Sequence, residues 1–369
     1  MQPTIISTLF TNELRPDFEA AATISQVQHL ASYNWIESDH PTIAIPGSPN
    51  LWSPRWPTQK RRGKKLLKVP KDSGLLYIAQ NAARHPASPM EPLFRSLYFT
   101  RPAFDIGAVD IVTDRNNIRK LLTFINPRHN RSRLEDFTIQ IERQGRTMLL
   151  CRQEIWTRDF IPRQQFRGFG HEFENAATSR RIPDSTGHYR IVSYDFAGLS
   201  CLVRYETDGY ISSGEGVDSA MGRSSPSILD PPTAISPYSA LRICAGGQTV
   251  PTQSILEIKT KARREPVDLQ QVLPQMWVSQ TSQLACAYYI RDGWFERCQP
   301  KDLESEIRKW EQNYQDDLQR LAALLRWIIA SIPTSGQQAT LEYYSRRNQL
   351  VISHAERAAM LPPDLYDRW

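Results

Sequence analysis

Alternating apolar and polar positions in the middle of the chain predict two β-hairpins. In residues 137–155 apolar residues first occupy alternate positions, a turn follows at Gln144 and Gly145, and a second apolar run comes after it. Residues 188–210 repeat this pattern around a turn near Gly198. Successive side chains of a strand point to opposite faces, so each pattern is typical of a half-buried antiparallel hairpin. A β-sheet is therefore expected to begin near residue 137.

Other stretches have the three-to-four-residue spacing of helices. Residues 89–99 and 114–125 predict two helices with a loop between them. Pro274 suits the first turn of a further helix that reaches Gln280, and a strand is expected after it. The longest apolar stripe lies in residues 302–332 and predicts one long helix packed on the core.

The composition along the chain divides it into segments. Residues 1–75 are rich in Pro, Trp and turn residues, and we expect them to be irregular. A main folded domain is predicted over 76–332, with a flexible Ser-, Gly- and Pro-rich insertion at about 211–240 and a surface tail at 333–369. The basic run at 60–68 is open to three interpretations: contact with a phosphate backbone, a nuclear address, or a solvated loop.

Overall composition narrows the class of protein. The 369 residues are 40% hydrophobic, which allows a sizeable core, and the net charge of +6 favours an anionic partner such as nucleic acid. The five cysteines are odd in number and form no C-x-x-C pair, which indicates reduced thiols inside the cell. No apolar run is long enough to span a bilayer, and no His or Cys spacing is typical of zinc. We therefore expect a soluble protein without a membrane partner.

Two charges inside the strand-like run LEIKT raise the question of chemistry. Glu257 and Lys259 share one face of the predicted strand, whereas Leu256 and Ile258 share the other. In metal-dependent phosphodiester cleavage a carboxylate holds the cation, and an ammonium orients the attacking water or offsets phosphate charge. The alternative is an ion pair on a solvated sheet surface, which short motifs often turn out to be.

Further carboxylates are available to share a metal with Glu257. Glu206 and Asp208 lie on one face of the strand in RYETDGY, and Glu174 follows Phe173 in GHEFE. Together they supply enough oxygen ligands for one or two Mg²⁺ or Mn²⁺ ions. Spacing alone does not separate Glu174 from its neighbour Glu172 as the ligand.

The order of these motifs resembles the decapping and exoribonuclease (DXO) family, including the branch that partners a nuclear 5′–3′ exonuclease. VDIVTDRNNIRKLL, GHEFE, YETDGY, LEIKT, MWVSQT and YYIRDG follow one another between about residues 70 and 295. The resemblance implies an α+β fold with a PD-(D/E)XK nuclease-like core, in which two mixed β-sheets are flanked by helices. The predicted hairpins agree with such a core.

The resemblance also implies roles for individual residues. It implies ligation of a divalent cation, Mg²⁺ or Mn²⁺, by Glu174, Glu206, Asp208, Glu257 and the backbone carbonyl of Ile258, with Glu206 at a second ion or an ordered water. Lys259 and Gln280 are implied to hold the nucleophilic water and the scissile phosphate. Arg115 is implied to contact a phosphate near the RNA 5′ end.

Two motifs depart from the family pattern. Where the family has Trp-Arg-Gly, this chain has Asp114, Arg115 and Asn116, and Glu172 replaces the lysine that precedes Phe-Glu. Both changes remove features that could touch RNA, whereas the carboxylates expected to bind the metal are all present. The departures therefore bear on the accepted 5′ end more than on the chemistry.

The leading hypothesis is a metal-dependent RNA 5′-end hydrolase, a decapping enzyme or pyrophosphohydrolase with or without 5′–3′ exoribonuclease activity, in RNA 5′-end quality control. One alternative is a catalytically inactive RNA-binding protein that partners a 5′–3′ exoribonuclease. A second is a DNA-directed nuclease on the same core. Nuclear localisation is expected, with a cytoplasmic pool as the alternative.

Overall fold

The computed structural model describes most of the chain. The described residues are 4–16, 21–58, 65–130, 132–162, 165, 168–212, 229–265 and 267–369. Most of the basic run, at 59–64, and most of the predicted insertion, at 213–228, lie outside the described residues. The predictions made for the undescribed residues remain predictions, whereas the described end of the predicted flexible insertion contains Thr233–Ala234, a strand of the large sheet.

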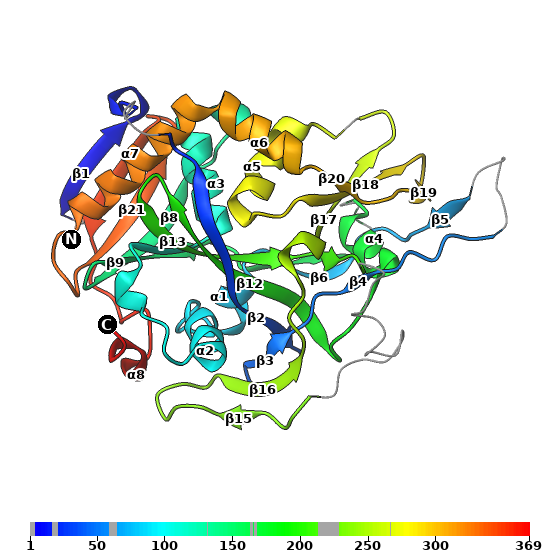
Figure 1. Ribbon diagram of the computed structural model, residues 1–369, viewed down its shortest axis with the longest axis horizontal. Helices are drawn as coiled ribbons and strands as arrows, with labels where there is room; N and C mark the ends of the chain where they lie inside the picture. The colour runs from blue at the N-terminus through cyan, green and yellow to red at the C-terminus, as the bar shows by residue number, and fades with distance from the viewer. Residues whose placement is uncertain are drawn as a thin grey trace.

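A large mixed sheet forms the centre of the molecule (Figure 1). Within the described residues it has twelve strands, in the spatial order β1 (Ile5–Phe10), β22 (Gln349–His354), β21 (Gln338–Tyr344), β8 (Phe137–Gln144), β9 (Thr147–Gln153), β7 (Ile111–Asp114), β13 (Leu199–Thr207), β12 (Ser185–Phe196), β2 (Ile24–Ile36), β3 (Thr42–Gly47), β16 (Arg242–Gly247) and β15 (Thr233–Ala234). Strand β7 runs parallel to both β9 and β13, and β3 runs parallel to β16. The other neighbours are antiparallel.

A smaller mixed sheet lies beside the large one. Its strands within the described residues are β11 (Thr178–Ser179), β4 (Leu51–Trp52), β14 (Gly209–Tyr210), β17 (Ile255–Ala262), β18 (Gln283–Tyr289), β19 (Trp294–Glu296) and β5 (Leu66–Lys68), with β20 (Lys301–Asp302) paired to β18. Strands β17 and β18 are parallel, so a crossover must join them, and helix α5 (Leu269–Ser279) lies in that connection. Strands β6 (Gly74–Tyr77) and β10 (Arg158–Ile161) form a separate two-stranded ribbon.

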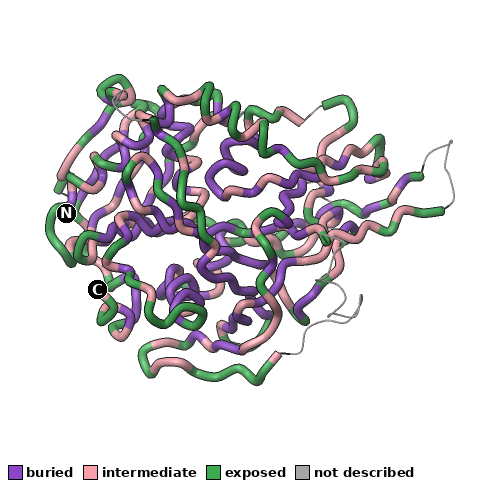
Figure 2. Tube along the Cα trace, viewed as in Figure 1, coloured by how far each residue is buried: buried purple, intermediate pink, exposed green. Residues whose placement is uncertain are grey.

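Helices cover both faces of the large sheet. Helices α3 (Arg115–Ile125), α5, α6 (Glu304–Asn313) and α7 (Gln315–Ser331) pack against one face with Met148 and Leu150 of β9. Helices α2 (Glu91–Thr100) and α8 (Pro363–Tyr366) pack against the other face, where Leu149 and Cys151 point. The remaining helical segments are α1 (Gln80–Arg84), α4 (Gly170–Ala177) and short 3-10 turns at Thr11–Glu13, Ile106–Ala108, Pro127–His129 and Thr252–Ser254. Figure 2 shows buried chain concentrated in the strands between these layers.

Several sequence predictions are confirmed. The fold is α+β, with mixed sheets flanked by helices. Both hairpins form, β8–β9 around Gly145 and β12–β13 around Gly198, and α2 and α3 occupy the two predicted helical stretches. Among the described residues, no helix combines the length and apolarity needed to cross a bilayer.

The prediction of irregular structure for residues 1–75 was wrong. Strands β1, β2 and β3 all belong to the large sheet. The second half of β2 is buried on both faces, so it lacks the alternation that marks a half-buried strand. Its polar residues Ser32 and Asn34 are buried and bond to Pro46 and Ser48, and in the sequence this polarity resembles that of a loop.

Three further predictions need correction. The tail after Pro333 is not at the surface, because β21 and β22 belong to the large sheet and Leu341 and Ile352 are fully buried. Residues 302–332 form two helices, α6 and α7, that are separated at Tyr314. Pro274 lies inside α5, whose first turn is capped by the Asp268 carboxylate five residues earlier than predicted.

Candidate active site

The chain passes from the large sheet to the small one at the predicted Glu-x-Asp motif. Strand β13 ends at Thr207, Asp208 follows, and Gly209 begins β14 of the smaller sheet. A side chain at position 209 would place its Cβ 2.9 Å from the Asn50 carbonyl oxygen, so this close crossing requires glycine. The Asp208 carboxylate is fixed on the other side, where Oδ2 accepts the Ile258 N–H at 2.7 Å. Asp208 therefore lies beside β17.

Glu257 of β17 is the buried centre of a charged cluster. Only 3% of the residue is exposed. Its Oε2 accepts from Arg115 Nη1 at 3.2 Å, and its Oε1 accepts from Lys259 Nζ and from the Gln275 amide. Glu257 and Lys259 share one strand face, as predicted. A solvated surface ion pair is excluded, because Glu257 is covered by α3 and α5.

Glu174 reaches the same region from helix α4. The helix begins where the Asp72 carboxylate accepts the N–H groups of Gly170 and Glu172, both at 2.9 Å, which satisfies donors that a helix start leaves free. Phe173 is fully buried in the small-sheet core and fixes the rotation of the helix. Glu174, and not Glu172, lines a pocket with Asp208. Of the two neighbouring carboxylates, Glu174 therefore lies near Asp208, and its role as a metal ligand stays a prediction.

The carboxylates of this cluster influence each other strongly. Burial and the neighbouring Asp208, Glu206 and Glu257 raise the pKa of Glu174 well above its ordinary value. Burial and Glu257 likewise raise the pKa of Asp208 to about 7. Burial also acts to raise the pKa of Glu257, but the charges of Lys259 and Arg115 outweigh it and lower that pKa to about 2. Negative charge is thus neutralised at Glu257 and left uncompensated at Glu174 and Asp208.

The raised pKa of Asp208 predicts a pH-dependent contribution to stability. Between pH 5 and 7 the folded protein holds the Asp208 proton while the unfolded chain has lost it, so stability falls as pH rises. Relative to Asp208→Asn, the wild type in EDTA should lose up to about 1.4 kcal/mol of unfolding free energy per pH unit. Urea unfolding at several pH values measures this difference. A constant difference across the range would contradict it.

The comparison with the variant is needed because other groups act in the opposite sense. His29 and His188 are buried, and burial lowers both pKa values, that of His29 to about 3. Both imidazoles are therefore neutral when folded and charged when unfolded below about pH 6.5, so their contribution rises with pH. They contribute equally to wild type and Asp208→Asn, so the difference removes the histidine contribution and leaves that of Asp208 together with its effect on Glu174.

The donor set suits a hard divalent cation. Among the described residues, no three His, Cys, Asp or Glu side chains are already arranged as a metal-binding group. Glu174 and Asp208 nevertheless offer carboxylate oxygens whose ionised form the protein alone does not stabilise, and a divalent cation would stabilise it. Glu257 would join them by giving up contact with Lys259 or Arg115. The residues therefore fit such an ion in chemistry and charge, and their role as ligands stays a prediction.

Gln275, not Gln280, contacts the cluster. Gln280 follows α5 in a left-handed conformation, and its amide donates to the Trp277 carbonyl. Gln275 reaches Glu257 from the buried face of α5, between Val272 and Ser279. A polar residue on an otherwise buried helical stripe was a usable signal, but placing the helix start at Pro274 concealed it. The role assigned to Gln280 stays a prediction.

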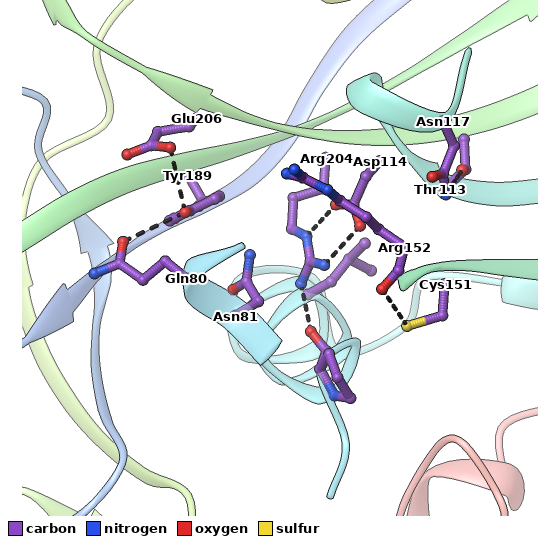
Figure 3. Close-up of polar contacts among 12 residues, drawn as sticks. Gln80, Asn81, Thr113, Asp114, Asn117, Cys151, Arg152, Tyr189, Arg204 and Glu206 are labelled. Carbon is purple, nitrogen blue, oxygen red and sulfur yellow. Dashed lines mark hydrogen bonds and ion pairs between the residues drawn. The ribbon is translucent and has the colours of Figure 1, made fainter. Parts of the chain in front are cut away.

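Two pockets flank Glu206. The first, which we call the arginine pocket, has a volume of about 130 Å³ and is lined by α1, α3, β9 and β13. The second, about 350 Å³, includes Glu174, Asp208, His171 and His188. Glu206 itself is exposed and lines both pockets. Figure 3 shows it beside Tyr189, whose hydroxyl lies 3.4 Å from Glu206 Oε2 and 3.3 Å from the Gln80 amide oxygen.

A buried ion pair holds the start of α3 next to the cluster. Arg204 of β13 donates to both carboxylate oxygens of Asp114, at 2.7 and 3.0 Å, and to the Pro89 carbonyl at 2.8 Å (Figure 3). Asp114 ends β7 and immediately precedes Arg115, the first residue of α3. The pair therefore fixes the backbone from which Arg115 reaches Glu257.

Solved structures with this architecture belong to Rai1 proteins. Rai1 of S. pombe matches with a TM-score of 0.59 and 12% identity, covering 95% of this chain and 99% of that one. Candida albicans Rai1 in complex with pU5-Mn²⁺ matches with a TM-score of 0.62 and 11% identity over 98% of both chains. Scheffersomyces stipitis Rai1 in complex with (3′-NADP)⁺ and calcium ion gives 0.60 and 11%, over 98% and 97%. The chain therefore has the fold of Rai1, as the resemblance to the DXO family predicted.

The sequence itself also matches a defined family. A family model described as a domain of unknown function, DUF8563, matches residues 4–364, so the chain belongs to that family. No curated protein matches the sequence significantly. The structural likeness at 11–12% identity shows the fold, and function must be argued from the site.

Proposed function

We propose that this protein is a metal-dependent hydrolase that acts at the 5′ end of RNA. The observation that carries the proposal is the pair formed by buried Glu257 and Lys259 in a Rai1 fold, beside Asp208, which lines a pocket with Glu174. The complexes of Rai1 relatives with pU5 and Mn²⁺, or with a calcium ion, support an RNA substrate and a divalent cation.

The residues of the cluster have different catalytic roles, which follow from their charges. A divalent cation held by Glu174, Asp208 and Glu257 would supply Lewis-acid catalysis. The Lys259 ammonium, fixed by Glu257, is placed to stabilise negative charge that develops on the phosphoryl oxygens. Arg115, held by the same carboxylate, orients the phosphate, and Gln275 keeps the Glu257 side chain in position.

The test is incubation of the purified protein with 5′-labelled RNAs that carry a cap, a triphosphate, a monophosphate or a hydroxyl. Reactions contain Mg²⁺ or Mn²⁺, with EDTA as the control, and released products are separated and counted. Cation-dependent release from at least one 5′ end is expected. The same ends on DNA distinguish an RNA hydrolase from a DNA-directed nuclease on this core.

A second candidate is an inactive RNA-binding protein that partners an exoribonuclease. It is favoured by the full set of protein partners around Glu257, which neutralise this carboxylate without any cation. RNA binding without product release from any of the RNAs, in either metal, is the result that this candidate predicts.

A further inference from the structure

The arginine pocket contains positive charge that the protein does not neutralise. Four guanidinium groups line it, those of Arg115, Arg119, Arg152 and Arg204, against the two carboxylates of Asp114 and Glu206. Arg204 is committed to Asp114, and Arg115 is committed to Glu257. Arg152 shares Glu154 with Lys120, so among the described residues the lining guanidinium left without a carboxylate partner is that of Arg119.

Arg119 is the source of this positive charge. Within the described part of the chain its guanidinium has no hydrogen-bond or ion-pair partner, although Arg119 is half-buried on α3. Burial and the nearby guanidinium of Arg115 lower its pKa to about 10, against a smaller opposing effect of the Glu257 charge. Arg152 uses its Nε to bind Glu154 at 2.7 Å, and its terminal nitrogens have no such partner among the described residues.

Two neutral groups near these arginines also lack partners. The Tyr205 hydroxyl and the Asn116 amide oxygen are buried without a hydrogen bond to any residue that the structure describes, and both residues line the pocket. A buried polar atom left unpaired costs about 1–3 kcal/mol, so a ligand that pairs with them gains that energy. Tyr205 offers an O–H donor, and the Asn116 amide can turn to offer N–H.

We propose that Arg119 and Arg152, with Tyr205 and Asn116, bind a terminal phosphoryl group next to the Glu257 cluster. Arginine recognises phosphate through paired N–H donors, and several such donors face this pocket. The volume of the arginine pocket is about 130 Å³. For comparison, a protein cavity of roughly 150 Å³ holds one benzene molecule. A space of this size accommodates a phosphoryl group at a chain end.

This inference rests on the proposed function, because it names the RNA 5′ end that the same site selects. A larger hollow along α3, lined by Lys120, Arg133 and Phe137, shares Arg119 and Arg152 with the arginine pocket. Arg119 could therefore follow the RNA backbone instead of its end. The experiment must separate these two uses, and it must also separate an RNA end from a free phosphate.

The test measures binding of the full chain in EDTA to one short RNA that carries a 5′-triphosphate, a 5′-monophosphate or a 5′-hydroxyl. The wild type should bind the phosphorylated ends about tenfold or more tightly, because a hydrogen bond to a charged group contributes about 1.5–3 kcal/mol. Arg119→Met should reduce this preference to about twofold or less and leave 5′-hydroxyl RNA unchanged. Arg119→Lys should restore part of it, because the positive charge is retained.

Matched controls make each outcome decisive. Arg308→Met removes an exposed arginine on α6 and should keep the wild-type preference. An equal loss for all three RNAs in Arg119→Met would assign Arg119 to the backbone and overturn the proposal, and so would an unchanged preference. Arg119 has no partner among the described residues, so its replacement should not unfold the protein, which thermal unfolding verifies.

Two further measurements are needed. One distinguishes an RNA end from a free phosphate as the ligand, and the other separates this proposal from the proposed hydrolase function. Inorganic pyrophosphate, added as a competitor, should displace triphosphate RNA from the wild type and not from Arg119→Met. If inorganic pyrophosphate instead binds both proteins equally, the pocket does not hold the phosphoryl group and the proposal fails. If the binding preference depends on Arg119 and no RNA is hydrolysed, the phosphoryl-binding proposal is supported and the proposed hydrolase function is rejected. If RNA is hydrolysed and no such preference is found, the hydrolase function is supported and the phosphoryl-binding proposal is rejected.

Discussion

Lys259→Ala is expected to lower the rate of RNA 5′-end hydrolysis by about a hundredfold or more while RNA binding stays within a few fold. Loss of one electrostatic contact to the transition state commonly has a rate effect of this size, because the contact strengthens as charge develops at the phosphate. RNA binding draws on several phosphate contacts, so the loss of one changes affinity far less. Single-turnover cleavage and equilibrium binding, measured on the same labelled RNA, provide the two numbers.

Lys261→Ala is the matched control for this variant. Lys261 lies two residues further along β17, on the same strand face, and is half-buried like Lys259. Its removal changes net charge equally and should leave the hydrolysis rate close to that of the wild type. If Lys259→Ala cleaves every capped, triphosphorylated and monophosphorylated RNA as fast as wild type, the catalytic role of Lys259 is wrong.

Glu257→Gln should weaken the binding of Mn²⁺ by about a hundredfold or more, beyond the roughly 10–100-fold typical of residues that only support metal ligands. The substitution removes a negative ligand and keeps the shape of the side chain. It also leaves the charges of Lys259 and Arg115 without their shared carboxylate, and these charges then repel the cation. Calorimetric titration with Mn²⁺ measures the change.

Glu172→Gln serves as the control for Mn²⁺ binding. Glu172 is on α4, two residues from Glu174, and does not line the pocket that Glu174 and Asp208 share. Its affinity for Mn²⁺ should match that of the wild type. Unchanged Mn²⁺ affinity in Glu257→Gln would falsify the assignment of Glu257 as a ligand.

Local sequence patterns were sufficient for elements whose two faces differ in polarity. The β8–β9 and β12–β13 hairpins have that difference and a turn glycine, so alternation located them correctly. Strand β2 is buried on both faces, and β22 pairs with β1 from the opposite end of the chain. Neither property appears within a window of neighbouring residues, which is why the first 75 residues and the tail were interpreted wrongly.

Some features of the candidate site also followed from local sequence patterns, whereas others depend on contacts between distant segments. The shared face of Glu257 and Lys259 followed from strand geometry alone. The contact between Arg115 and Glu257 joins residues 142 positions apart, and only the family resemblance brought these two into one site. Asp72, which caps α4, comes from a segment about 100 residues away and gave no signal of its role. The unpaired charge of Arg119 likewise depends on the surrounding fold.

The ion pair between Asp114 and Arg204 has a consequence for how related sequences diverge. Removing one member of a buried pair strands the other charge, which commonly destabilises a protein by about 3–5 kcal/mol. A single substitution at either position should therefore rarely persist, whereas a joint replacement by neutral residues can. Across the descendants of a common ancestor, aspartate at 114 should be inherited together with arginine at 204. Related chains that have tryptophan at position 114 should have an uncharged residue at position 204. The two positions, which are 90 residues apart, should therefore change together in evolution.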